Sequence, residues 1–253
     1  MKRTLILSDL QVPDHDIRAV KAIANFAQVW RPDELLCVGD EFDSPEAARW
    51  NKGYAEEYAG TLDRNRNETV NILRLFRIGR MRSIPFHLMR SNHGDRIRKY
   101  LMRYAPALHG LPELEYAALL RFEELGITYH ERPYEFAPGW LMAHGDEGSL
   151  IHTSGGTAMN LAQRWGKSVV CGHTHRLGVQ HRHHSVGGRI TQPLFGVEVG
   201  HLMDMRKADY LKAGHGNWQQ GFALAYGEGR TTHVVPVPIV NRSFVVDGKR
   251  WSW

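Results

Sequence analysis

The feature that most constrains the fold of this chain is its alternation of short apolar runs with amphipathic helical stretches. Residues 4–7 and 35–38 are apolar runs of strand length, and residues 17–30 between them carry apolar side chains at helical spacing. This order predicts a β-α-β unit. It places the chain in the α/β class.

The alternation continues along the chain and then gives way to strands. Helices are expected at residues 54–79, 96–104, 109–126 and 157–165, and strands at residues 85–89, 140–143 and 168–171. The last third is dominated by strand-like segments, at residues 179–183, 189–195, 222–226, 232–237 and 244–246. A core of two sheets flanked by helices fits this order best. No repeat or Pro/Ser-rich linker interrupts it, so residues 1–253 are expected to form a single domain.

The composition favours a cytoplasmic protein with a full hydrophobic core. The chain has 253 residues, 42% of them hydrophobic, which suits one layered domain. No run approaches the roughly 18 apolar residues that cross a bilayer, and the first residues lead straight into a strand, so neither a membrane span nor a signal peptide is expected. The two cysteines, Cys37 and Cys171, end apolar runs and are expected to be buried thiols. Trp251 and Trp253 suit either the core or a subunit contact.

Charge and histidine content narrow the function further. A net charge of +5 suits an anionic partner, although many basic proteins have none. The fifteen histidines are more informative, because several stand at spacings typical of metal ligands.

Residues of metal-ligand type follow five of the expected strands. The pairs are Asp9 with Gln11, Asp40 with Asp43, Asn92 with His93, His144 with Asp146, and His173 with His175. In layered α/β folds the carboxyl ends of strands meet in one crevice, so side chains far apart in sequence gather there. One such pair is ordinary turn chemistry, but five together predict a metal site.

These residues resemble the signature of the calcineurin-like metallophosphoesterase family. The matching motifs are Asp9-Leu10-Gln11, Gly39-Asp40-Glu41-Phe42-Asp43, Ser91-Asn92-His93, His144 and Gly172-His173-Thr174-His175. They span residues 9–175 in the family's order. The resemblance implies a four-layer α-β-β-α sandwich with two mixed sheets flanked by helices. Residues 217–222 resemble a segment of phage-encoded members, which would place the protein in the cytoplasm of a host cell.

The resemblance also implies two divalent transition-metal ions and their ligands. Asp9, Gln11, Asp40 and His175 would surround one ion, and Asp40, Asn92, His144 and His173 the other, with Asp40 bridging both. Manganese is expected first, while iron, nickel, cobalt and zinc also accept mixed imidazole and oxygen ligands. Two such ions would lower the pKa of a bound water toward about 7, so that a metal-bound hydroxide attacks the phosphate ester.

His93 is expected to act on the substrate rather than on a metal. Neighbouring side chains point apart, so His93 cannot easily be a ligand if Asn92 is one. It suits a general acid or a phosphate contact, and the resemblance implies the same role with Asp43 as the residue that orients it. The expected substrate contacts are Asn92, His93, His15, Asp95 and Arg96.

Two departures from the family pattern affect the site. Gln11 stands where the family commonly has histidine, and a neutral amide should bind a transition metal more weakly than imidazole. His15, with Asp14 and Asp16, would either compensate near that ion or form a capping turn before a helix. Ser91 replaces a common glycine, and Asp95 follows His93 by two residues rather than one.

The function that these observations favour is hydrolysis of phosphodiesters or phosphomonoesters, of nucleotides or cyclic nucleotides above all. One alternative is a nuclease on DNA or RNA, motivated by Arg74, Arg77, Arg80 and Arg82. An alternative of a different class is a non-catalytic scaffold on the same fold, which Gln11 alone favours. The oligomeric state stays open, and no membrane partner is expected.

Overall fold

The computed structural model describes residues 1–53, 57, 61–208 and 216–253, and within them the chain forms two large mixed sheets and a small ribbon. The first sheet has the order β11-β10-β1-β2-β3-β4 and the second the order β5-β6-β7-β9-β8. The strands of the first are β1 (Lys2–Leu7), β2 (Glu34–Cys37), β3 (Phe86–Met89), β4 (Ile127–His130), β10 (Gly221–Glu228) and β11 (Thr231–Pro238). Those of the second are β5 (Tyr134–Ala137), β6 (Trp140–Met142), β7 (Ser168–Cys171), β8 (Leu177–Val186) and β9 (Arg189–Val199), and β12 (Ser243–Val246) pairs with β13 (Lys249–Ser252) in the ribbon.

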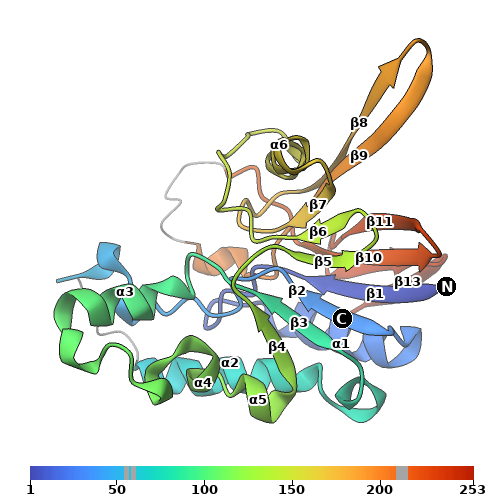
Figure 1. Ribbon diagram of the computed structural model, residues 1–253. Helices are drawn as coiled ribbons and strands as arrows, with labels where there is room; N and C mark the ends of the chain where they lie inside the picture. Colours follow the sequence, from blue (N-terminus) through green and yellow to red (C-terminus); the bar gives the residue numbers. More distant parts are fainter. Residues whose placement is uncertain (54–56, 58–60, 209–215) are drawn as a thin grey trace.

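Helices cover the outer face of each sheet, so the two mixed sheets lie in the middle of a four-layer arrangement (Figure 1). On the side of the first sheet lie α1 (Ile17–Trp30), α2 (Leu62–Leu75), α4 (Tyr116–Leu119) and α5 (Phe122–Leu125), and on the side of the second lies α6 (Gly156–Trp165). The remaining helix, α3 (Asp95–Tyr104), lies at the end of the molecule away from the projecting β8–β9 hairpin. The predicted α/β fold of two sheets flanked by helices is confirmed.

The layers follow from the two-residue period of the central strands. On β1, Leu5 and Leu7 pack against the α1 side, whereas Ile6 between them points into the cluster shared by the two sheets. On β7, Val170 joins that same inner cluster, while Val169 and its neighbours pack under α6. Both faces of these strands are buried, which explains their unbroken apolar runs.

Parallel strands bring the loops of both sheets to one edge. In the first sheet β1, β2, β3 and β4 run parallel, and in the second β6, β7 and β9 do. The loops that leave β1 and β2 are joined by the Asp9 N–H, which donates to the Gly39 carbonyl at 3.1 Å. The Gly172 N–H after β7 donates to the His144 carbonyl after β6 at 2.9 Å. The His173 N–H donates to Asp9 Oδ2 at 3.0 Å and so joins the loops of the two sheets. The expected convergence of strand ends therefore occurs across both sheets.

The helix predicted at residues 109–126 is wrong in its extent. That stretch forms a 3₁₀ turn at Pro112–Leu114 followed by the two single-turn helices α4 and α5. Arg121 between them has a left-handed backbone with φ of 54°, which interrupts any continuous helix. Leu111 is 43% exposed. The 3₁₀ turn buries no side chain, whereas α4 buries Leu119 and α5 buries Phe122 and Leu125.

The bounds of the other helices and strands differ less from those predicted. The helix predicted at residues 54–79 begins at Leu62, capped by the Thr61 hydroxyl, and ends at Leu75, while residues 54–56 and 58–60 lie outside the described residues. Three strands, β4, β5 and β13, were not predicted. The helices expected at residues 17–30, 96–104 and 157–165 are confirmed within one residue.

The structure also tests the predictions made for the cysteines, the C-terminal tryptophans and a membrane span. Cys37 and Cys171 are buried free thiols, as predicted. Trp251 and Trp253 pack against the core cluster that includes Phe26 and Phe244, so the core explanation holds for them. Within the described residues, none of the helices has the length and apolar character needed to cross a membrane.

Candidate metal centre

The predicted ligands lie on tight turns at the strand ends, and five of the seven have a left-handed backbone. The φ angles are 46° at Asp9, 55° at Gln11, 54° at Asp40, 66° at His173 and 56° at His175. Each such non-glycine residue costs of order 1–3 kcal/mol and persists only where the surroundings enforce it. Backbone strain gathered on candidate ligands indicates a functional site.

Asp40, His144 and His173 form one cluster, in which one possible ligand atom from each lies within 4.8 Å of the others. The fully buried His144 ring is oriented by the Val38 carbonyl, 2.8 Å from Nδ1. That contact places a ring proton on Nδ1 and turns Nε2 toward the site. The Asn92 Oδ1 atom lies 2.8 Å from this Nε2, and the Asp40 Oδ2 atom lies 3.4 Å from it.

Asp9, Gln11 and His175 form the other half of the centre. His175 Nε2 lies 3.1 Å from Asp9 Oδ1, yet this buried oxygen accepts no hydrogen bond. A carboxylate oxygen and an imidazole nitrogen that face each other at this spacing suit a shared cation. The Gln11 amide nitrogen lies 3.2 Å from Asp40 Oδ2 and 3.4 Å from His175 Nε2. An amide rotated by 180° would present its oxygen to an ion at the same place.

Spacings between the candidate ligand atoms fit a shared metal shell. Two ligands about 2.1 Å from one ion lie about 3.0 Å apart at a right angle and about 3.4 Å apart at the tetrahedral angle. The contacts of His144 Nε2 with Asn92 and Asp40, and of His175 Nε2 with Asp9, measure 2.8, 3.4 and 3.1 Å. The residues present therefore fit divalent cations bound by mixed nitrogen and oxygen donors.

The buried carboxylates of the site favour a bound positive charge. Burial alone would raise the pKa of Asp40, but His144 and His93 more than offset it and bring the pKa well below its usual value. Burial also opposes a charge on His144, yet Asp40 raises the pKa of that imidazole to about 10. Buried carboxylates that draw protons onto neighbouring histidines are expected to bind metal ions in their place.

His93 and Asp43 meet at the rim of the centre. His93 Nδ1 lies 2.7 Å from Asp43 Oδ1, a contact that is short but not aligned as a hydrogen bond, as is common before substrate binds. Arg96 contacts both residues, with one guanidinium nitrogen 2.8 Å from Asp43 Oδ1 and another 2.8 Å from His93 Nε2. Because a guanidinium only donates, the ring proton of His93 lies on Nδ1 here. Burial would raise the pKa of Asp43, but His93 and Arg96 lower it.

The remaining predicted residues lie at different distances from this centre. Asp95 and Asp146 both pair with Arg90, at 2.6 and 3.3 Å, so Asp146 serves an ion pair between two ligand loops. Asp16 caps α1 by accepting from the N–H groups of Arg18 and Ala19, which confirms the capping turn. His15 is buried beside Glu68, at 3.9 Å, and its part in substrate binding stays a prediction.

Two buried residues near the centre were missed by the sequence reasoning. The Glu41 Oε1 atom accepts from the Tyr116 hydroxyl at 2.6 Å, and burial raises the pKa of this carboxyl to about 7. The fully buried His201 ring lies 5.3 Å from the His175 ring, and its Nδ1 accepts from the Met203 N–H. Glu41 stands inside a recognised motif, whereas His201 lies in a stretch without any local signal.

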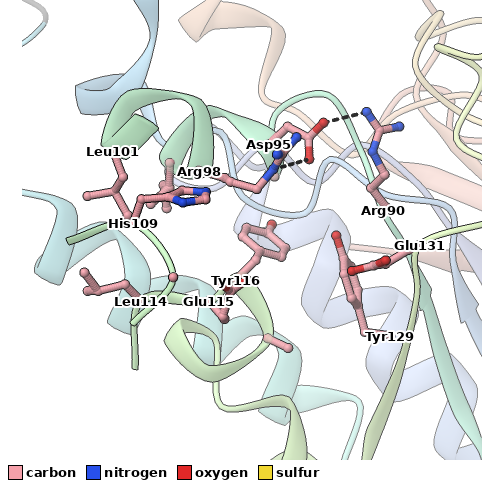
Figure 2. A pocket seen from close by; sticks show the side chains of 14 residues that line it. Arg90, Asp95, Arg98, Leu101, His109, Leu114, Glu115, Tyr116, Tyr129 and Glu131 are labelled. Atoms are coloured by element: carbon pink, nitrogen blue, oxygen red, sulfur yellow. Dashed lines mark hydrogen bonds and ion pairs between the residues drawn. The ribbon is translucent and has the colours of Figure 1, made fainter. Parts of the chain in front are cut away.

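A cavity of about 510 Å³ lies behind α3 (Figure 2). Its walls include Gly94 and Asp95 directly after His93, and Figure 2 shows the Tyr116 ring inside it with the Arg90–Asp95 pair above. The Tyr116 hydroxyl bonds to Glu41, next to Asp40, so this ring lies between the cavity and the metal ligands. The Tyr116 side chain therefore forms part of the cavity wall and connects it to the loop that carries Asp40.

Comparison with known proteins finds two relatives that match this chain over nearly its whole length. The chain is 38% identical to the Gene 54 proteins of Mycobacterium phage D29 and Mycobacterium phage L5, over 99% of each chain. No family model matches it.

Solved structures resemble it only distantly. Vps29 of Cryptosporidium parvum has a TM-score of 0.47 at 13% identity, covering 98% of this chain and 94% of that one. Zinc-complexed Vps29 of Entamoeba histolytica has a TM-score of 0.46 at 13% identity, covering 98% and 95%. A predicted phosphoesterase of Streptococcus pneumoniae TIGR4 has a TM-score of 0.36 at 13% identity, covering 100% and 98%. Scores below 0.5 carry no functional weight, so function is inferred from this chain's own side chains.

Proposed function

The chain belongs to the family of the mycobacteriophage Gene 54 proteins, and we propose that it is a metal-dependent hydrolase of phosphate esters. Two divalent cations would be held by the seven candidate ligands, with Asp40 between them. Manganese is the first candidate, and iron, nickel, cobalt and zinc suit the same donors. The proposed place of action is the cytoplasm of the infected host.

One observation carries this proposal. Lone pairs from carboxylates, imidazoles and an amide face each other at 2.8 to 3.4 Å in a buried site, and beside them stands a histidine 2.7 Å from a carboxylate. A scaffold with no chemistry to perform has no reason to keep His93 and Asp43 at the rim.

The chain's own residues have separate tasks in this mechanism. Bound divalent cations would polarise the phosphate ester and supply a nucleophile at neutral pH. Arg96 would bind a phosphate oxygen and leave His93 Nε2 as it does so. Once Arg96 has left it, His93 Nε2 would take up a proton from solvent, and Asp43 would hold the ring and stabilise the resulting positive charge. Nε2 would then give this proton to the leaving oxygen.

The substrate is proposed to be a nucleotide ester, mono- or diester. The two anionic ligands Asp9 and Asp40 leave two divalent cations with excess positive charge, which favours an anionic phosphate. Arg96 adds a further cation at 2.8 Å from His93.

The test is a matrix of metals and substrates. Metal-stripped protein would receive manganese, nickel, cobalt, zinc or magnesium and be assayed on phosphomonoesters, linear diesters, cyclic nucleotides and oligonucleotides. We expect turnover that needs metal and that Asp40→Ala abolishes, while Glu228→Ala, on the exposed end of β10, keeps it. Full activity of Asp40→Ala would place the chemistry elsewhere. Failure to bind any metal, together with no turnover, would favour the scaffold.

A further inference from the structure

We propose that the exposed face of α3 is a docking track for a single-stranded polynucleotide, which leads it to the metal centre. The inference deepens the proposed function and rests on it for the position of the scissile phosphate. Its evidence is the pattern of cations and tyrosines on a helix that begins beside His93.

Cationic and aromatic side chains form one stripe along α3. Arg96, Lys99, Tyr100, Arg103 and Tyr104 stand at spacings of three and four residues, which places them on one face of the helix. Ile97 is buried on a different face. The stripe is about 12 Å long at the usual helical rise.

The helix that carries the stripe has an excess of positive charge, although Asp43 pairs with Arg96. The helix carries four cations, at residues 96, 98, 99 and 103, against one carboxylate, Asp95. That carboxylate already binds Arg90 at 2.6 Å, and its 3.6 Å contact with Lys99 leaves the lysine side chain 60% exposed. Within the described residues no carboxylate pairs with Arg103. Such a surface attracts a chain of phosphates.

Two tyrosines interrupt the cations and favour unstacked bases. The Tyr100 and Tyr104 rings lie 4.9 Å apart, and Tyr104 is 45% exposed. Lys52 lies over both rings, at 5.2 and 4.9 Å, and also binds Glu57 at 2.5 Å. Arg103 lies over the Tyr104 ring at 5.3 Å, so a stacked base would take the place of one of these flexible cations. Aromatic faces alternating with cations are typical of single-strand binding, because every base has a face that stacks. A duplex hides those faces, so single strands are the better fit.

Arg96 connects the stripe to the chemistry. It begins the track and contacts His93 Nε2 at 2.8 Å, so a phosphate bound there is next to the proposed acid. The arginines predicted from the sequence to contact nucleic acid lie elsewhere, and two of them bind other parts of this chain. Arg77 donates to main-chain carbonyls of Leu125, Met81, Ile84 and Arg82 at 2.7 to 2.8 Å, and Arg74 pairs with Glu124.

The test measures binding without hydrolysis. Fluorescently labelled oligothymidylate, and a duplex of equal length, would be titrated with the full chain in EDTA at several salt concentrations. The double variant Lys99→Gln/Arg103→Gln should bind the single strand about 25-fold more weakly at 0.1 M salt, because each lost phosphate contact is worth a factor of about 5 there. The slope of log Kd against log salt should fall by about 1.4.

A second variant tests the aromatic part. Tyr104→Leu should weaken single-strand binding by about fivefold or more and leave duplex binding nearly unaffected. The matched control is Arg18→Gln/Lys21→Gln, which removes two exposed charges from α1. It should bind like the original protein, and circular dichroism would check the fold of every variant.

The outcomes separate this inference from the proposed function. Equal losses in the α3 variant and the α1 control would overturn the track, even if the protein hydrolyses small esters. Tight binding of polyglutamate or phosphatidylserine vesicles, with no effect of Tyr104→Leu on oligothymidylate, would also overturn it in favour of a general anionic surface. Binding through α3 without hydrolysis under any metal would support the track and refute the phosphoesterase.

Discussion

Replacing His93 with alanine should slow the hydrolysis of esters with poor leaving groups far more than that of esters with good ones. If His93 protonates the leaving oxygen, its loss matters most for an oxygen that needs the proton. A phenyl ester leaves as a phenolate whose conjugate acid has a pKa of about 10, as in tyrosine, whereas a p-nitrophenolate leaves readily without protonation.

The expected size follows from the contacts of the ring. A side chain held 2.7 Å from Asp43 and only 17% exposed is well placed for general acid catalysis, which contributes about 10²–10⁴-fold. His93→Ala should therefore lower kcat on the phenyl ester by that factor, or about 3–5 kcal/mol in activation free energy. On the p-nitrophenyl ester the loss should stay below about tenfold.

Asp43→Asn is the companion variant, because the Asp43 carboxylate contacts the His93 ring directly. It should show the same dependence on the leaving group with a smaller loss, about 10–100-fold on the phenyl ester. Combined with His93→Ala it should cost almost nothing more, since residues that act as one unit are not additive.

The assay is steady-state kinetics on the paired esters, with metal content measured for each variant. Equal losses on both esters would refute the acid role and leave His93 as a phosphate contact. Normal rates on both would remove His93 from the mechanism.

Three further predictions concern the scaffold of the site. Gly172→Ala places a methyl group against the carboxylate of Asp9, so its affinity for metal should fall at least about tenfold in a calorimetric titration. The control is Gly227→Ala, where the new methyl group has space and the affinity should not change. Glu198→Ala removes the buried carboxylate that accepts hydrogen bonds from two N–H groups at the start of α6. The free energy of unfolding in urea should therefore fall by about 2–4 kcal/mol, and a fall below about 0.5 kcal/mol would contradict this role. Burial lowers the pKa of His87, so the unfolded chain binds its proton more readily and stability should fall as pH drops below about 6.5. The fall should be shallower in His87→Phe, and identical slopes of unfolding free energy against pH would show that His87 does not contribute.

The parts of the fold that the sequence predicted are those set by local periodicity. Helix α1 was placed at its observed bounds because Ile23, Phe26 and Trp30 repeat at helical spacing and Asp16 caps the start. Where the pattern depended on context, the prediction was wrong. The leucines of residues 109–126 have helical spacing, but the left-handed Arg121 divides the stretch.

The candidate ligands could also be found from sequence, because each follows an apolar strand in a recognisable motif. Their assembly could not. Whether Asp9 meets His175, or Asn92 meets His144, depends on how two sheets pack face to face, and no local pattern encodes that packing.

The sequence by itself determined which residue types end the strands, since strand periodicity and motif spacing are properties of short segments. Only the tertiary structure decided which cations stay exposed on the surface. Arg77 and Arg103 look alike in the sequence, yet main-chain carbonyls surround the first while the second is exposed on α3. The physical reason is that a guanidinium binds whatever acceptors folding brings within about 3 Å, and those acceptors come from distant parts of the chain.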